Sequence, residues 1–136
     1  MRILIVEDEH RLGELVAKGL REEGLAADLA ATRARARELM IENPYDLILL
    51  DLMLPDGDGL SLLRQMRGEA RTAQLPVVIV SGEKTAAAER EVASLDVEDW
   101  LLKPIDGERL VRAVRHVAGR NPAGRPRVLH VEDDAD

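Results

Sequence analysis

The fold is decided by residues 46–57, Asp46-Leu47-Ile48-Leu49-Leu50-Asp51-Leu52-Met53-Leu54-Pro55-Asp56-Gly57. The tetrapeptide Leu47–Leu50 is entirely apolar and leads directly into Asp51, which is typical of a central strand buried on both faces. The Pro, Asp and Gly residues at positions 55–59 predict a turn. The apolar residues from Leu60 to Met66 then predict a short helix.

The same alternation of patterns continues on both sides of this stretch. Short apolar runs predict strands at residues 2–6, 25–30, 77–80 and 100–102. Apolar residues at helical spacing predict helices at residues 11–23, 32–43, 85–94 and 110–117. We expect Gly24 to end the first helix and Thr32 to cap the second. Five strands alternating with five helices predict a doubly wound α/β fold, in which helices cover both faces of a five-stranded parallel sheet.

Composition excludes several classes of function. A chain of 136 residues suits one compact domain, and a net charge of -7 argues against direct binding of nucleic acid. The absence of cysteine excludes disulfides and thiolate chemistry, which suits a reducing compartment. No apolar run approaches the roughly 20 residues that span a bilayer, and the N-terminus lacks the layout of a signal peptide. We therefore expect a cytoplasmic protein without membrane insertion.

Polar side chains follow four of the predicted strands at the point where each strand ends. The first strand leads into Glu7 and Asp8, the central strand into Asp51, and the next two strands into Ser81 and Lys103. In an open parallel sheet the functional groups gather beyond the carboxyl ends of the strands. We therefore expect these five side chains to converge on one edge of the sheet.

The chemistry of this set favours a magnesium site that accepts a phosphoryl group. Three carboxylates beside one lysine leave about two uncompensated negative charges, which are costly to pack together without a cation. Oxygen ligands without His or Cys favour Mg²⁺ over zinc. Lys103 and Ser81 can hold phosphoryl oxygens, and Asp51 is the natural nucleophile for an acyl phosphate. Taken singly, each of these residues could serve instead as a helix cap, a turn residue or a solvated loop cation.

At this point the sequence resembles a known family, the receiver domains of bacterial two-component response regulators. The resemblance covers roughly residues 1–118, and it implies a flavodoxin-like sheet with strand order 2-1-3-4-5. The motifs that carry it occur in the family's order and each lies at a strand end: Val6-Glu7-Asp8-Glu9, residues 46–57, Val80-Ser81-Gly82 and Leu102-Lys103-Pro104.

The resemblance also implies a set of ligands and reacting groups. Asp51 matches the phosphoacceptor, and together with Glu7 and Asp8 it matches the carboxylates that hold Mg²⁺. The backbone carbonyl of Met53 matches the remaining protein ligand. Lys103 matches the cation that pairs with the phosphoryl group.

Further positions match residues that act after phosphorylation. Ser81 matches the switch hydroxyl that turns toward the phosphate, and Trp100 matches the aromatic residue that moves with it. Met53 and Glu83 match the side chains that flank the phosphoryl group, and we expect Met53 to hinder the water that removes it. Pro104 is expected to follow a cis peptide bond, as in the family.

The function implied is that of a signalling domain which catalyses only its own phosphorylation and dephosphorylation. The phosphoryl group would come from a histidine kinase or a histidine phosphotransfer protein. The signal would pass to a downstream domain or effector protein through the surface formed by residues 85–94, 100–102 and the last helix, which could also form a homodimer. The alternatives are a phosphate-independent docking or dimerisation module of the same fold, and a hydrolase of the haloacid dehalogenase type. The hydrolase needs a second Asp where this chain has Met53.

The C-terminal residues restate the N-terminal ones. Arg127-Val128-Leu129-His130-Val131-Glu132-Asp133-Asp134 repeats the pattern of Arg2-Ile3-Leu4-Ile5-Val6-Glu7-Asp8-Glu9 at a constant offset. We infer that residues 127–136 begin a second receiver domain after a linker at 119–126, so that residues 1–118 form the first of two tandem domains. The alternative is a tail that is apolar and then acidic by chance. The arginines at positions 33, 35 and 37 are interpreted as a solvated helix face.

Overall fold

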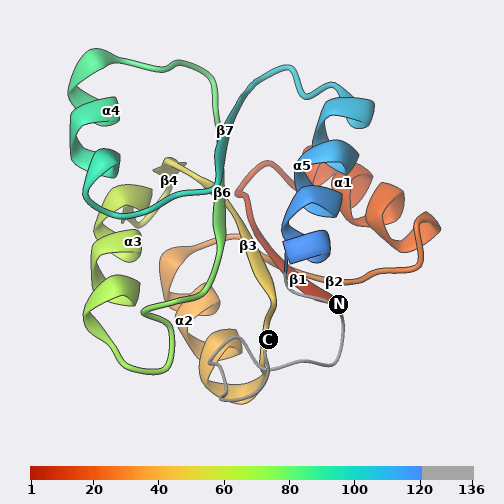
Figure 1. Ribbon diagram of the computed structural model, residues 1–136, viewed down its shortest axis with the longest axis horizontal. Helices are drawn as coiled ribbons and strands as arrows, with labels where there is room; N and C mark the ends of the chain where they lie inside the picture. The colour runs from red at the N-terminus through yellow and green to blue at the C-terminus, as the bar shows by residue number, and fades with distance from the viewer. Residues whose placement is uncertain (121–136) are drawn as a thin grey trace.

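The computed structural model describes residues 1–120, in which strands and helices alternate along the chain (Figure 1). The strands are β1 (Arg2–Val6), β2 (Ala26–Ala30), β3 (Leu47–Asp51), β4 (Met53–Leu54), β5 (Gly57–Asp58), β6 (Val77–Ser81) and β7 (Asp99–Leu102). The helices are α1 (His10–Glu22), α2 (Arg33–Glu42), α3 (Gly59–Gly68), α4 (Ala86–Ala93) and α5 (Gly107–Arg120). No helix among the described residues combines the length and the apolar character that crossing a membrane requires.

The main sheet has five parallel strands in the order β2-β1-β3-β6-β7. This order is the predicted 2-1-3-4-5 once the two short strands β4 and β5 are set aside. All five residues of β3 are buried, as expected of a central strand covered on both faces. The predicted α/β fold is confirmed.

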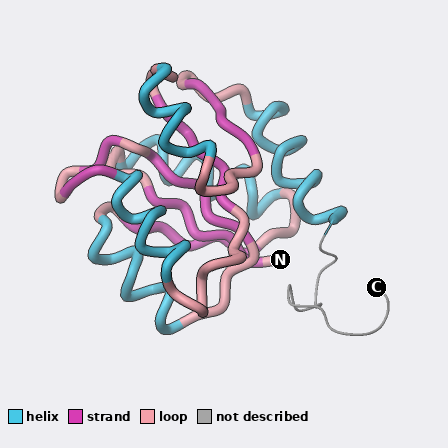
Figure 2. Tube along the Cα trace, turned by 60° about the vertical axis from the view of Figure 1, so that its left-hand side comes forward, coloured by secondary structure: helices cyan, strands magenta, loops and turns pink. Residues whose placement is uncertain are grey.

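Successive side chains of each strand enter two different cores, one on each face of the sheet. Ile3, Ile5 and Leu49 pack with the apolar faces of α1 and α5. Leu4 and Leu50 point to the opposite face and pack with α2, α3 and α4. Figures 1 and 2 show the sheet between these two layers of helices. Because both faces are covered, polar groups can reach solvent only at the ends of the strands.

Helix boundaries follow the predicted signals closely. Gly24 follows the end of α1 with a positive φ of 85°, and the hydroxyl of Thr32 accepts a hydrogen bond from the backbone N–H of Arg35. The last helix continues to Arg120, so the predicted start of the linker at residue 119 falls inside α5. The predicted second domain at 127–136 lies outside the described residues.

The predicted turn at residues 55–59 is part of a small hairpin. Met53 and Leu54 pair antiparallel with Asp58 and Gly57. Sequence patterns missed these strands because two-residue strands are too short to show an alternation of apolar and polar residues. The hairpin returns the chain to the end of β3, where Gly59 begins α3 directly over the backbone of Asp51.

This close approach predicts a large effect of a single methyl group. A Cβ atom at position 59 would lie 2.4 Å from the carbonyl oxygen of Asp51 and 2.8 Å from the Cα atom of Leu52. Both are backbone atoms that cannot turn aside, so we expect Gly59→Ala to lower the free energy of unfolding by about 2–3 kcal/mol. Urea denaturation would measure this. Gly68→Ala is the control, since a Cβ atom there meets nothing within 4 Å; equal stability of the two variants would contradict the expectation.

Candidate functional site

The register of the sheet places the predicted site residues side by side at one edge. Val6 pairs with Leu50, so that Glu7 and Asp51 both lie one position further along neighbouring strands. Asp51 pairs with Val80, and Ser81 is the next residue of β6. Ser81 in turn pairs with Leu102, and its carbonyl accepts a hydrogen bond of 2.8 Å from the backbone N–H of Lys103. The carboxyl ends of four adjacent strands therefore bring these side chains to one place.

Burial sets this edge apart from the rest of the molecule. Four polar or charged side chains are buried among the residues that the structure describes, and three of them are Glu7, Asp51 and Ser81. The fourth, Thr72, donates a hydrogen bond from its hydroxyl to the carbonyl of Met66. Burying a carboxylate is costly unless it is paired. The buried carboxylates of Glu7 and Asp51 therefore require a positively charged partner.

Lys103 supplies one positive charge to both buried acids. Its Nζ atom lies 2.9 Å from Oε1 of Glu7 and 3.1 Å from Oδ2 of Asp51. The other oxygen of Asp51, Oδ1, accepts a hydrogen bond of 3.0 Å from the backbone N–H of Met53. Oε2 of Glu7 accepts one of 3.1 Å from the backbone N–H of Glu9. Each acid is thus held by one ammonium and one backbone amide.

The pKa values at this edge reflect competition between burial and pairing. Burial raises the pKa of Glu7, although its hydrogen bond to Lys103 opposes the rise. Burial alone would lower the pKa of Lys103, but its hydrogen bonds to Glu7 and Asp51 outweigh that effect and raise it. Lys103 therefore stays charged at neutral pH, and one ammonium still faces more than one carboxylate.

The third carboxylate completes a cluster that fits a small divalent cation. One oxygen each of Glu7, Asp8 and Asp51 lie within 4.8 Å of one another, and Asp8 is exposed to solvent. Oxygen donors without His or Cys suit Mg²⁺. The donor set therefore fits the ion, and the exposure of Asp8 leaves one side of the cluster open to water.

A cavity beside the cluster contains the residues predicted to meet the phosphoryl group. Met53, Ser81 and Glu83 line a space of about 540 Å³ between the β4–β5 hairpin and the beginning of α4. The hydroxyl of Ser81 accepts a hydrogen bond of 3.4 Å from the backbone N–H of Glu83. The side chain of Met53 is 74% exposed and borders the opening. This space is open to solvent and reaches Leu52, the residue after Asp51, but none of the three clustered carboxylates lines it.

The sequence matches the response regulator receiver domain family over residues 3–115. The chain belongs to this receiver domain family. Solved structures agree with the assignment. A two-component response regulator from Clostridium difficile is similar with a TM-score of 0.82 and 28% identity, over 88% of this chain and 97% of that one. A sensor protein from Polaromonas sp. JS666 has a TM-score of 0.80 and 36% identity, over 88% of this chain and 96% of that one.

Curated relatives of this receiver domain are regulatory proteins. The transcriptional regulatory protein CusR of Escherichia coli (strain K12) is 35% identical over 123 residues, which are 90% of this chain and 53% of that protein. The response regulator ArlR of Staphylococcus saprophyticus is 37% identical over 123 residues, covering 89% of this chain and 54% of that protein. The chain therefore spans about half the length of the curated relatives it matches.

Trp100 lies three residues before the site lysine of the receiver domain. Its ring packs against the core on the side of α2, α3 and α4, and the ammonium of Lys84 lies 5.5 Å from the ring centroid. The indole N–H is buried and has no hydrogen-bond partner. The peptide bond between Lys103 and Pro104 is cis.

The interpretation of the α2 arginines as a solvated helix face holds only in part. Arg35 is exposed and contacts Glu38, and Arg37 contacts Gln65 and Glu69 at the surface, but the side chain of Arg33 is only 29% exposed and contacts Asp56. Sequence reasoning missed the contact of Arg33 in particular, because Asp56 lies 23 residues away in a turn where Asp has an ordinary local role.

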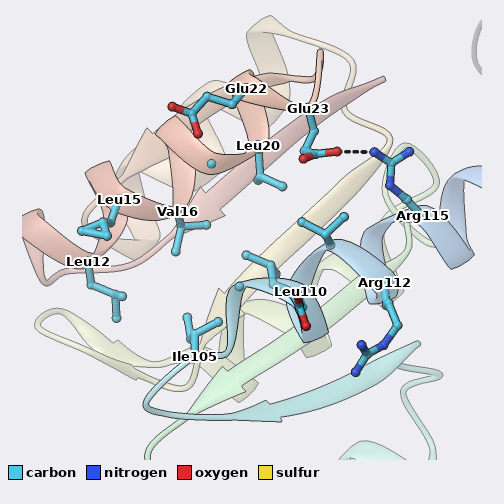
Figure 3. A pocket seen from close by; sticks show the side chains of 14 residues that line it. Leu12, Leu15, Val16, Leu20, Glu22, Glu23, Ile105, Leu110, Arg112 and Arg115 are labelled. Carbon is cyan, nitrogen blue, oxygen red and sulfur yellow. Dashed lines mark hydrogen bonds and ion pairs between the residues drawn. The ribbon is translucent and has the colours of Figure 1, made fainter.

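The receiver domain also has a larger hollow away from the carboxylates. A groove of about 700 Å³ lies between α1 and α5, where Leu12, Leu15 and Val16 face Ile105 and Leu110 (Figure 3). None of the proposed site residues lines it. An apolar groove is poorly suited to a phosphoryl group, so its size does not make it the reactive site.

Proposed function

We propose that Asp51 is the phosphoacceptor of this receiver domain and that its phosphorylation requires Mg²⁺ held by Glu7, Asp8, Asp51 and the backbone carbonyl of Met53. The observation that carries the proposal is the arrangement around Lys103, whose ammonium bonds to two buried carboxylates while a third lies beside them. One ammonium neutralises only one of these carboxylates, and the remaining negative charge is costly to bury. The carboxylates that Lys103 does not neutralise are explained by a Mg²⁺ ion that takes part in the reaction.

Each residue has a distinct task in the transfer. An oxygen of Asp51 forms the new bond to phosphorus as the bond from phosphorus to the donor's imidazole nitrogen breaks, and that nitrogen keeps the electron pair and takes up a proton. Lys103 leaves Asp51 to hold an oxygen of the transferred group. When bound, Mg²⁺ would neutralise negative charge on the carboxylate and phosphoryl oxygens. The exposed side chain of Met53 would hinder water at the acyl phosphate, while Glu83 borders the same space.

The signal is proposed to travel through Ser81 and Trp100. The hydroxyl of Ser81 turns from the backbone N–H of Glu83 toward the phosphoryl oxygens. The buried and unpaired indole N–H of Trp100 leaves the ring in a position that costs about 1–3 kcal/mol in unmade hydrogen bonding. A change at Ser81 on the neighbouring strand can therefore move the ring, and with it the surface of α4, β7 and α5.

This surface is proposed to meet a downstream domain, an effector protein or a second copy of the domain. The phosphoryl group is proposed to come from a histidine kinase or a histidine phosphotransfer protein, and the domain would catalyse only its own phosphorylation and dephosphorylation. We also propose, on the repeat in the sequence alone, that residues 127–136 begin a second receiver domain.

Acetyl phosphate provides a direct test of the proposed function. We expect the protein to gain the mass of one phosphoryl group in the presence of Mg²⁺ and none in EDTA, as measured by mass spectrometry of the intact chain. Hydroxylamine should remove the group, because it cleaves acyl phosphates. Since Trp100 is the chain's single Trp, its fluorescence should change in the same reaction. A phosphate-independent docking module would gain no mass under any of these conditions.

A further inference from the structure

The hairpin that follows the acceptor strand is tied to the beginning of α2. The carboxylate of Asp56 accepts hydrogen bonds from the backbone N–H groups of Arg33, at 2.9 Å, and Ala34, at 3.1 Å. The hydroxyl of Thr32 accepts a third from Arg35, at 3.0 Å. The first N–H groups of a helix have no partner within the helix and need an acceptor. Here two of the three acceptor contacts come from a residue of the hairpin.

The side chain of Arg33, at the beginning of α2, in turn contacts Asp56. Its Nη2 atom donates a hydrogen bond of 2.6 Å to the carbonyl of Asp56, and its side chain is only 29% exposed. The guanidinium lies so close to Gly57 that a Cβ atom there would be 2.5 Å from Cζ. Gly57 also has a positive φ of 142°, which favours glycine. The chain thus reaches this geometry only because residue 57 has no side chain.

The clamp formed by Arg33 and Asp56 connects to the carboxylate cluster through the hairpin. Gly57 pairs with Leu54, and Asp58 pairs with Met53. The backbone N–H of Met53 donates to Oδ1 of Asp51 at 3.0 Å. The clamp therefore holds one arm of a short hairpin whose other arm contacts the acceptor carboxylate.

We propose that Arg33 and Asp56 are positioning residues that hold the Met53–Asp58 hairpin over Asp51 and so strengthen the binding of Mg²⁺ without touching it. This inference rests on the proposed function, in which the carbonyl of Met53 is a ligand. A mobile loop would have to be ordered when the ion binds, and that ordering would weaken binding. Because the clamp orders the hairpin in advance, the carbonyl stays close to its binding position.

The experiment compares Mg²⁺ affinity in the wild type and in Asp56→Ala. Loss of a group that orients a metal ligand typically costs 10- to 100-fold in affinity, and we expect about tenfold here. The rise of the unfolding midpoint over a series of MgCl₂ concentrations gives the affinity. The NMR signal of the Met53 amide provides a second readout, which should already shift in Asp56→Ala before Mg²⁺ is added.

Glu69→Ala is the matched control. Glu69 pairs with Arg37 of α2 at 3.2 Å, so its loss removes the same charge and a comparable ion pair without touching the hairpin. We expect it to leave the Mg²⁺ affinity unchanged. If Asp56→Ala does not fold, Arg33→Lys takes its place, since it keeps the charge and loses the bond from Nη2. Wild-type affinity in the clamp variants overturns the inference, whereas a wild type that binds no Mg²⁺ overturns the proposed function.

Discussion

An Asp51→Asn variant should keep the fold and lose phosphoryl uptake from acetyl phosphate by more than about a thousandfold, as expected when a nucleophile is removed. Asn has nearly the same shape as Asp, and its oxygen can still accept the hydrogen bond from the backbone N–H of Met53. The buried position at the end of β3 therefore remains filled. The variant lacks the carboxylate oxygen that would form the bond to phosphorus, together with the negative charge that pairs with Lys103.

The matched control for this substitution lies at the other end of the same strand. Asp46 precedes β3, and its carboxylate accepts a hydrogen bond of 2.7 Å from the backbone N–H of Arg2. Asp46→Asn removes the same charge but leaves the cluster intact, so uptake should match the wild type. Mass spectrometry of the intact chain, with and without hydroxylamine, measures both variants. Uptake by Asp51→Asn at the wild-type rate would place the acceptor elsewhere.

The sequence predicted the place of the site because the relevant signals are local. Glu7 and Asp51 each interrupt an apolar run, and a parallel sheet puts the ends of such runs at the same edge. Ser81 and Lys103 follow the next two strands in the same way. The pairing of the strands did not have to be known in advance, because all strands of a parallel sheet end at the same edge.

The sequence could not predict which side chains contact each other at that edge. Lys103 lies 2.9 Å from Glu7 and 3.1 Å from Asp51, and this shared contact depends on side-chain conformations rather than on strand order. The contact between Arg33 and Asp56 joins an exposed turn to a helix end. Each of the two residues also has an ordinary local role, Arg33 on a helix surface and Asp56 in a turn. Such long-range contacts between surface segments carry no periodicity in the sequence.

The shared position of Lys103 leads to a prediction with two effects of opposite sign. In Lys103→Met the two buried carboxylates lose their ammonium, so the cluster becomes more negative and should bind Mg²⁺ about tenfold more tightly, as expected for removing a unit positive charge next to the proposed ligands. Phosphoryl uptake should fall by about a hundredfold, because the transferred group loses the cation that holds its oxygen. Without Mg²⁺ the variant should be less stable by about 2 kcal/mol, because buried acids are left unpaired.

Tighter Mg²⁺ binding together with slower transfer separates a reacting lysine from a structural one. If Lys103 only stabilised the fold, its removal would disorder the carboxyl ends of the strands and weaken both Mg²⁺ binding and phosphoryl uptake. Lys18→Met is the control, because Lys18 is exposed on α1 and bonds to neither carboxylate; it should change neither quantity. Affinity follows from the shift of the unfolding midpoint with MgCl₂, and uptake follows from mass spectrometry. If Lys103→Met weakened Mg²⁺ binding, the excess of negative charge at this edge would not be what attracts the ion.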